Sequence, residues 1–148
     1  MVVRVRVPAW ATAAVTVSVN GTALASGTPG SFVALDRTWS NGDTISYSLP
    51  AAFRLTRYTG QARLAGLDRY ALEYGPILMA AVGTFSPGLV DQFNQGTVRI
   101  PVAAADLVAA LQPTATPLNF TVAGAPGVTF RPYWTVVQEQ MSVFPVLG

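Results

Sequence analysis

The fold class is decided by one short stretch near the N-terminus, Val15-Thr16-Val17-Ser18-Val19-Asn20-Gly21. Its valines alternate with hydroxyl side chains, which is the period-two pattern of a strand with one buried face. An Asn-Gly pair follows at once, and this pair favours a tight hairpin because both central positions of the turn need positive φ. The stretch therefore predicts an antiparallel β-hairpin.

The same period continues on both sides of this hairpin. Val3, Val5 and Val7 alternate with two arginines before Pro8, so the chain is expected to begin in a strand, as if it started in the middle of a larger protein. Further strands are predicted around Phe53 and Leu55 and over residues 31–35, 44–49, 63–67, 70–74, 77–82, 97–100, 118–122, 128–130 and 141–144. Turn residues separate them, which indicates an all-β fold, an antiparallel β-sandwich of jelly-roll-like type.

Two segments stand out from this pattern. Residues 77–82 are apolar at every position, which predicts a central strand covered on both faces. Residues 102–111 carry Leu107, Val108 and Leu111 at helical spacing and are followed by Pro113, so they predict one short helix in the C-terminal half.

The chain of 148 residues is long enough for one domain or two very small ones. Residues 1–83 are expected to form the β-sandwich core, and residues 84–96, rich in Gly, Pro and Asn, a long loop. Residues 97–148 then either complete the same domain or form a small second β unit.

Composition excludes several classes of function. Charged residues make up only 11% of the chain, against about 25% in typical domains, so part of the surface is expected to be covered by another component. The nine basic residues are all scattered arginines, which argues against a nucleic-acid partner. No apolar run approaches the roughly 18 residues of a membrane helix, so no membrane partner is expected either. Both a cytoplasmic and a secreted location remain open.

Catalytic chemistry finds little support in the residue types present. The chain has no Cys and no His, which excludes thiol nucleophiles, His-dependent triads and zinc sites built from these residues. Among the seven carboxylates, only Glu73 lies in a strand that otherwise looks buried, and it is expected to pair with Arg69 or Arg99. No catalytic residue, metal ligand or cofactor site is predicted.

Three aromatic residues are the candidates for contact with a carbohydrate or another domain: Trp39, Tyr133 and Trp134. Trp39 follows a strand, and we favour a role in closing an edge of the sandwich. Tyr133 and Trp134 follow Arg131-Pro132 and have no alternating strand pattern, which favours a surface position.

Five segments in the same order resemble the region that follows the catalytic barrel in glycoside hydrolase family 127, the β-L-arabinofuranosidase-like family. They are Arg4-Val5-Arg6-Val7-Pro8-Ala9-Trp10, Val17-Ser18-Val19-Asn20-Gly21, Asp36-Arg37-Thr38-Trp39-Ser40-Asn41-Gly42-Asp43, Tyr70-Ala71-Leu72-Glu73-Tyr74-Gly75-Pro76 and Phe130-Arg131-Pro132-Tyr133-Trp134. The resemblance spans residue 3 to about residue 145.

In that family an α/α barrel supplies a cysteine nucleophile and a metal site of cysteines and a glutamate. None of this machinery can be carried over to a chain without cysteine, so the resemblance implies the C-terminal β-sandwich region without its catalytic partner. The implied function is a non-catalytic accessory domain whose partner is the catalytic barrel of the parent protein, with homo-oligomerisation as a further possibility. The alternatives are a carbohydrate-binding module that uses exposed aromatics and, far behind, catalysis by Glu73.

Overall fold

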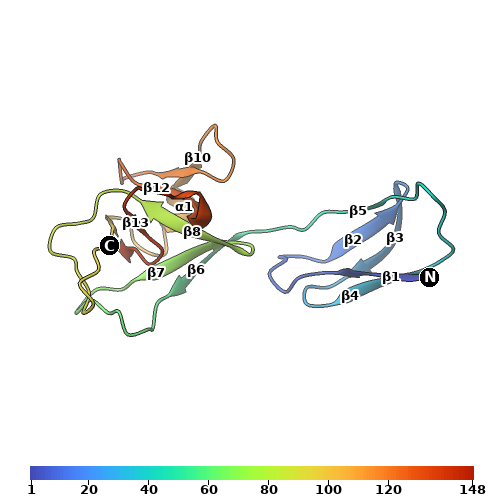
Figure 1. Ribbon diagram of the computed structural model, residues 1–148, viewed down its shortest axis with the longest axis horizontal. Coiled ribbons are helices and arrows are strands. Elements are labelled where there is room, and N and C mark those ends of the chain that lie inside the picture. Colours follow the sequence, from blue (N-terminus) through green and yellow to red (C-terminus); the bar gives the residue numbers. More distant parts are fainter. The chain divides into compact units, whose positions relative to one another are not determined.

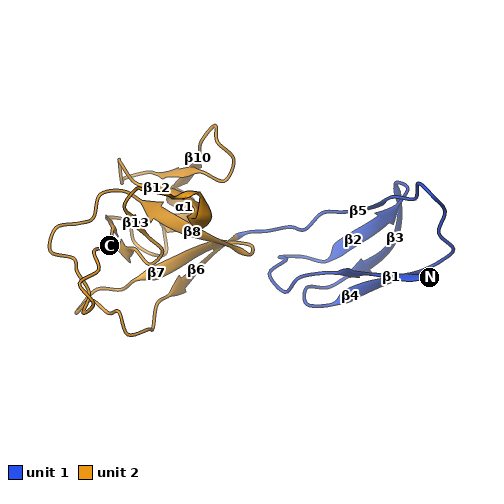
Figure 2. Cartoon of the chain, in the orientation of Figure 1, with its two compact units in different colours: residues 1–52 blue, residues 53–148 orange.

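The computed structural model describes residues 1–148, which form two compact units, residues 1–52 and residues 53–148 (Figures 1 and 2). Strands dominate both units, and the one α-helix has four residues, so the all-β prediction is confirmed. That helix is far too short to cross a membrane.

The first unit packs two small antiparallel sheets around a core of its own. Its strands are β1 (Val2–Arg6), β2 (Val15–Val19), β3 (Thr22–Gly27), β4 (Phe32–Asp36) and β5 (Ile45–Tyr47). Strand β1 pairs with β4, and β2 lies between β3 and β5. Val5, Val7 and the three valines of β2 are buried with residues of β4, as the period-two pattern predicts, whereas Val3 is only half-buried. The core comprises Val5, Val7, Ala11, Val15, Val17, Val19, Val33 and Leu35.

The hairpin between β2 and β3 has the two-residue turn that the sequence predicts. Val19 pairs with Thr22, and the two residues between them, Asn20 and Gly21, have φ values of 52° and 80°. Positive φ at both positions matches a type I′ turn, whose twist suits the right-handed twist of the flanking strands.

The second unit is built on one seven-stranded sheet. The strands of this unit, seven in the sheet and two outside it, are β6 (Phe53–Arg57), β7 (Tyr70–Tyr74), β8 (Ile77–Val82), β9 (Arg99–Ile100), β10 (Leu111–Pro113), β11 (Phe120–Val122), β12 (Thr129–Pro132), β13 (Met141–Ser142) and β14 (Val146–Leu147). The sheet runs β10-β11-β12-β8-β7-β6, with β13 also paired to β8, while β14 and β9 form a separate parallel pair.

Strand β8 is the centre of this sheet, as its uninterrupted apolar sequence predicts. It pairs with β7 through its first half and with β12 and β13 through its second half. Met79, Ala80 and Ala81 are completely buried. The core of the second unit comprises Leu72, Met79, Ala81, Val98, Ile100, Leu107, Val122, Ala125, Phe130 and Leu147.

Two elements differ from the sequence-based expectation. The helix expected over residues 102–111 is confined to α1 (Leu107–Ala110), and it ends there because Leu111 already pairs with Val122 in the sheet. Only Leu107 of its apolar residues enters the core, while Val108 is exposed. The strand expected over residues 63–67 is absent, since Leu64 and Leu67 pair with each other across a tight turn.

The 84–96 loop does not separate the two compact units. The two compact units meet at residues 52 and 53, and the loop is internal to the second unit. Strands β12 and β13 return after the loop to pair with β8, which precedes it, so the residues on both sides of the loop share one sheet.

Candidate functional site

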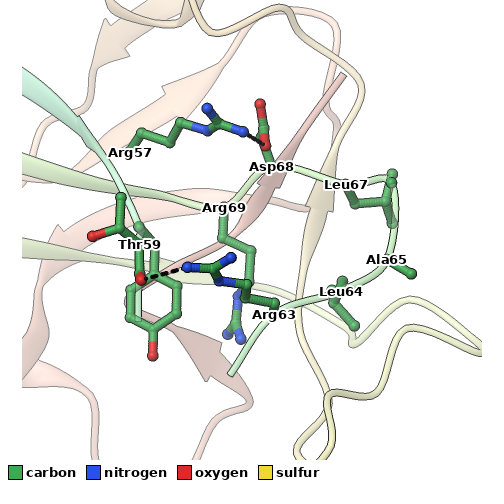
Figure 3. Close-up of a pocket in the computed structure, with 10 residues that line it drawn as sticks. Arg57, Thr59, Arg63, Leu64, Ala65, Leu67, Asp68 and Arg69 are labelled. Carbon is green, nitrogen blue, oxygen red and sulfur yellow. Dashed lines mark hydrogen bonds and ion pairs between the residues drawn. The ribbon is translucent and has the colours of Figure 1, made fainter. Parts of the chain in front are cut away.

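A cavity of the second unit lies in the connection between β6 and β7 (Figure 3). This pocket has a volume of about 420 Å³ and is lined by residues 57–59 and 63–69. Its neck is closed by the strand pair Arg57–Tyr70, and its tip is the turn that joins Leu64 to Leu67. One connection thus curls round and encloses the pocket, which we call the 57–69 pocket.

Charged side chains face one another across this pocket. The guanidinium of Arg57 donates to a carboxylate oxygen of Asp68, and this bond raises the pKa of Arg57. Arg63 donates from Nε to the carbonyl of Gly60 at 3.0 Å and from Nη2 to that of Thr59 at 3.1 Å. Arginine geometry suits this role because the planar fork can serve two acceptors at once.

A buried ion pair holds the base of the connection. The side chains of Arg69 and Asp91 are only 9% and 3% exposed, and their charged atoms lie 3.3 Å apart. Arg69 also donates to the carbonyls of Phe144 at 2.9 Å and Ala62 at 2.7 Å. These bonds tie the pocket to the 84–96 loop and to the last strands of the chain.

The carboxyl of Asp91 is held in its charged form. Burial alone raises its pKa, but the backbone N–H groups of Gln95 and Phe93 and the guanidinium of Arg69 outweigh that effect. The pKa of Asp91 therefore lies below its ordinary value, which is what a permanent partner for a buried guanidinium requires.

A second candidate surface is the segment from Tyr133 to Met141, which we call the aromatic segment. Tyr133, Trp134 and Val137 are 46%, 56% and 85% exposed, and the Tyr133 and Trp134 rings meet edge to face at 5.6 Å. This exposure agrees with the surface position expected for the two aromatics. Large contiguous patches of exposed apolar side chains are typical of contact surfaces.

The aromatic segment is held in place by the ion pair of Arg131 with Glu139. This hydrogen bond, helped by backbone N–H groups near Glu139, lowers the pKa of Glu139 to about 2. The carboxylate therefore stays charged at any physiological pH, and the segment remains closed at its base.

Trp39 lies in the first unit, in the segment that links β4 to β5, and it is half-buried. It packs against the core and donates its indole N–H to the carbonyl of Met1 at 2.8 Å. Arg37 lies over its ring at 5.1 Å and reaches Asp43 at 3.5 Å. Three of the four residues that carry the Arg-x-Trp-x-x-Gly-Asp resemblance thus stabilise one segment.

Comparison with known protein families gives a match to the first unit, which contains Trp39. Residues 1–51, almost the whole of the first unit, match the family model "Beta-L-arabinofuranosidase, GH127 middle domain". The resemblance to glycoside hydrolase family 127 is confirmed. The rest of the chain, from Ala52, lies outside the part that this GH127 model matches.

A solved structure titled "Glycoside hydrolase" resembles the whole chain in fold. The likeness covers 99% of this chain at a TM-score of 0.63, with 16% sequence identity. The chain spans 28% of the length of that protein. No protein of curated function matches the sequence.

The predicted contact residues are divided between the two compact units. Trp39 belongs to the GH127-like unit and packs against its core, whereas Tyr133 and Trp134 belong to the second unit. A role of these residues in contact with carbohydrate or another domain stays a prediction.

The structure gives most carboxylates an arginine partner. Glu73 does pair, but the partner is Arg54 at 2.8 Å, not Arg69 or Arg99. The two residues are direct cross-strand neighbours on β6 and β7, a register that the sequence alone does not reveal. No three His, Cys, Asp or Glu side chains are arranged to hold a metal ion.

The sequence does not predict the 57–69 pocket, because the pattern of residues 63–67 favours a strand. A usable signal was present, since three arginines and one aspartate occur within 13 residues that also contain Gly60 and Gly66. Gly66 has a φ of 73°, and a Cβ on Gly60 would collide with the ring of Tyr58. Glycines with such requirements indicate a folded loop and argue against a regular strand.

Proposed function

We propose that this chain is a non-catalytic accessory region of a glycoside hydrolase, held against the catalytic module of the same protein. The observation that carries the proposal is the match of residues 1–51 to the GH127 middle domain. The fold likeness of the whole chain to 28% of a larger glycoside hydrolase supports it. The name of the matched family makes β-L-arabinofuranosides the proposed substrates of the parent protein.

The aromatic segment is the proposed contact surface toward the catalytic module. It places four exposed apolar side chains within nine residues, namely Tyr133, Trp134, Val137 and Met141. Aromatic residues and Met are enriched at protein interfaces, and Tyr and Trp bury large areas there at low entropic cost. The low charge of the chain fits a region whose surface is partly covered.

The test begins with the coding sequence that flanks the chain, which should encode a catalytic barrel with clustered cysteines. That barrel, produced separately, should bind this chain in trans, and Trp134→Ala should weaken the binding at least about tenfold, as loss of an interface Trp often does. Phe32→Ala is the matched control, because Phe32 is an equally exposed aromatic residue of the first unit. If the Trp134→Ala variant bound the barrel as tightly as the parent, the aromatic segment would not be part of the interface.

A carbohydrate-binding module is the second candidate, supported by the exposed rings of Tyr133 and Trp134 beside the polar side chains of residues 138–140. The two functions differ in solution. An accessory region freed from its catalytic module should self-associate through the aromatic segment and bind no glycan. A module should sediment as a monomer and bind arabinose-containing oligosaccharides, with Trp134→Ala abolishing the binding. Sedimentation and a glycan screen on one preparation decide between them.

A further inference from the structure

The 57–69 pocket has the size and enclosure of a small-molecule site. Its volume of about 420 Å³ falls within the roughly 300–1,000 Å³ of typical ligand pockets. All of its lining residues come from one connection of the second unit, and its supporting contacts lie in the same unit. It is also separate in sequence from the aromatic segment.

The pocket is held open by its supporting contacts. The buried guanidinium of Arg69 fixes its base through the carbonyls of Ala62 and Phe144 and the carboxylate of Asp91. The ring of Tyr58 packs against that of Phe144 at 4.5 Å. A site whose walls are fixed before binding loses little conformational entropy when a ligand enters.

The groups that face the pocket combine positive charge with an apolar wall. Arg57 uses only one nitrogen on Asp68, and Nη1 of Arg63 has no partner in the protein, so both retain donors for a ligand. The charge of Arg69 is balanced by Asp91, which leaves two guanidinium groups against the single carboxylate of Asp68. Leu64, Ala65 and Leu67 supply the apolar side (Figure 3).

We propose that the 57–69 pocket binds a sugar acid, a monosaccharide or chain end whose carboxylate is held by Arg57 and Arg63. A guanidinium matches a carboxylate through paired, charge-assisted hydrogen bonds. The apolar C–H face of the sugar ring would lie on Leu64 and Leu67, and the free oxygen of Asp68 would accept a sugar hydroxyl. The carboxylate of the proposed ligand is inferred from the charged groups of the pocket. Its sugar ring is inferred from the proposed function.

The test is an NMR titration of the full chain with glucuronate and with glucose, which differ only in the carboxylate. Glucuronate should shift the backbone amide signals of residues 57–69 saturably, with a dissociation constant on the order of 1 mM, as expected for a ligand of this size. Glucose should bind at least about tenfold more weakly, because it lacks the charge-assisted pair. Acetate and sulfate should also bind more weakly, because they lack a sugar ring.

Two matched arginine variants distinguish the effect on binding of a charge in the pocket from that of a charge outside it. Arg57→Gln should weaken glucuronate binding about tenfold through loss of the paired bonds. Arg54→Gln is the matched control, since Arg54 lies on the same strand, is equally exposed and also pairs with a carboxylate, but does not line the pocket. Asp68→Asn should tighten binding by about threefold, because it removes a like charge from an exposed site.

Each contrary result overturns the proposal. Equal affinity for glucose, or weaker glucuronate binding by Asp68→Asn, would indicate a neutral-sugar site. Equal affinity for acetate or sulfate would indicate a simple anion site. If glucuronate shifted only amide signals outside residues 57–69, or shifted none, the pocket would not bind a sugar acid. None of these results bears on docking through the aromatic segment, so the accessory function stands or falls by its own experiment.

Discussion

The turn at Asn20 joins the hairpin that decides the fold to the segment that carries the GH127 resemblance. Asn20 adopts a φ of 52°, and its side-chain amide donates to Asp43 at 2.7 Å. Its side-chain oxygen accepts the backbone N–H of Thr44 at 2.9 Å. We therefore expect Asn20→Ala to destabilise the first unit through both its backbone and its side chain.

The size of this effect follows from two contributions. The left-handed conformation costs alanine roughly 1 kcal/mol more than asparagine, which tolerates that region. Loss of the hydrogen bond from the Thr44 N–H costs about 1 kcal/mol more, at a site that water can reach. Asn20→Gly removes only the second contribution, because glycine accepts positive φ without strain. We expect losses of about 2 kcal/mol for Ala and about 1 kcal/mol for Gly.

The assay must report on the first unit alone. The chain has three tryptophans, and Trp10 and Trp39 pack against the core of the first unit, whereas Trp134 lies exposed in the second. In a Trp134→Phe background, fluorescence during urea unfolding therefore follows the first unit. A small domain loses about 4–8 °C of melting temperature per kcal/mol, so thermal unfolding should resolve both variants.

The comparison of the two variants carries the refutation. Equal stability of the Ala and Gly variants would show that positive φ at position 20 imposes no strain. If both variants were as stable as the parent, the hydrogen bonds of the Asn20 side chain would make no contribution to stability either.

Acid provides an independent check of the same turn. The Ser40 N–H and then the Asn20 amide lower the pKa of Asp43, so the stability from this carboxylate is present above its ordinary value of 3.8. That stability is lost as the pH falls through the folded-state pKa. Asn20→Gly removes one donor and moves the pKa of Asp43 upward. The stability gap between parent and variant should therefore narrow in acid, and a gap independent of pH would contradict the assigned hydrogen bond.

Three further predictions concern the second unit. Phe130→Ala should cost about 3–5 kcal/mol in urea unfolding, since Phe130 is completely buried at the centre of the core. Asp91→Asn should lower the melting temperature more than Arg131→Gln does, because it leaves the buried Arg69 without a counter-charge. Arg131→Gln should move the pKa of Glu139 from about 2 toward 4.5 in a carboxyl ¹³C titration, abolishing a stabilisation that the parent keeps above about pH 4.5 and loses toward pH 2.

The sequence predicts those elements whose side chains follow a strict local period. The alternation in β1 and β2 and the Asn20-Gly21 turn depend on neighbouring residues alone, and the structure confirms them. The apolar run of β8 likewise predicts a central strand, because nothing polar in it could face water. Burial of one face is visible as apolar residues at every second position, and burial of both faces as a continuous apolar run.

The elements that were wrong or missed depend on contacts between distant residues. The helix ends at Ala110 because Leu111 finds a strand partner in Val122, and no local pattern indicates that pairing. The partner of Glu73 depends on the register of β6 against β7. The 57–69 pocket depends on Asp91, which lies 22 residues beyond the Arg69 that it fixes. A single sequence contains no direct signal of such pairs.

The few charges of this chain stabilise loops as much as they form ion pairs. Arg69 and Arg63 each donate to two backbone acceptors or more around the 57–69 pocket, where the chain has left regular pairing and its carbonyls need donors. A lysine could not replace either residue, because its ammonium is a single point of charge and cannot reach two separated carbonyls in fixed directions. The loops of the second unit are therefore held by guanidinium groups where the sheet provides no partner. That arrangement explains how a 12-residue connection can enclose an empty volume without collapsing into it.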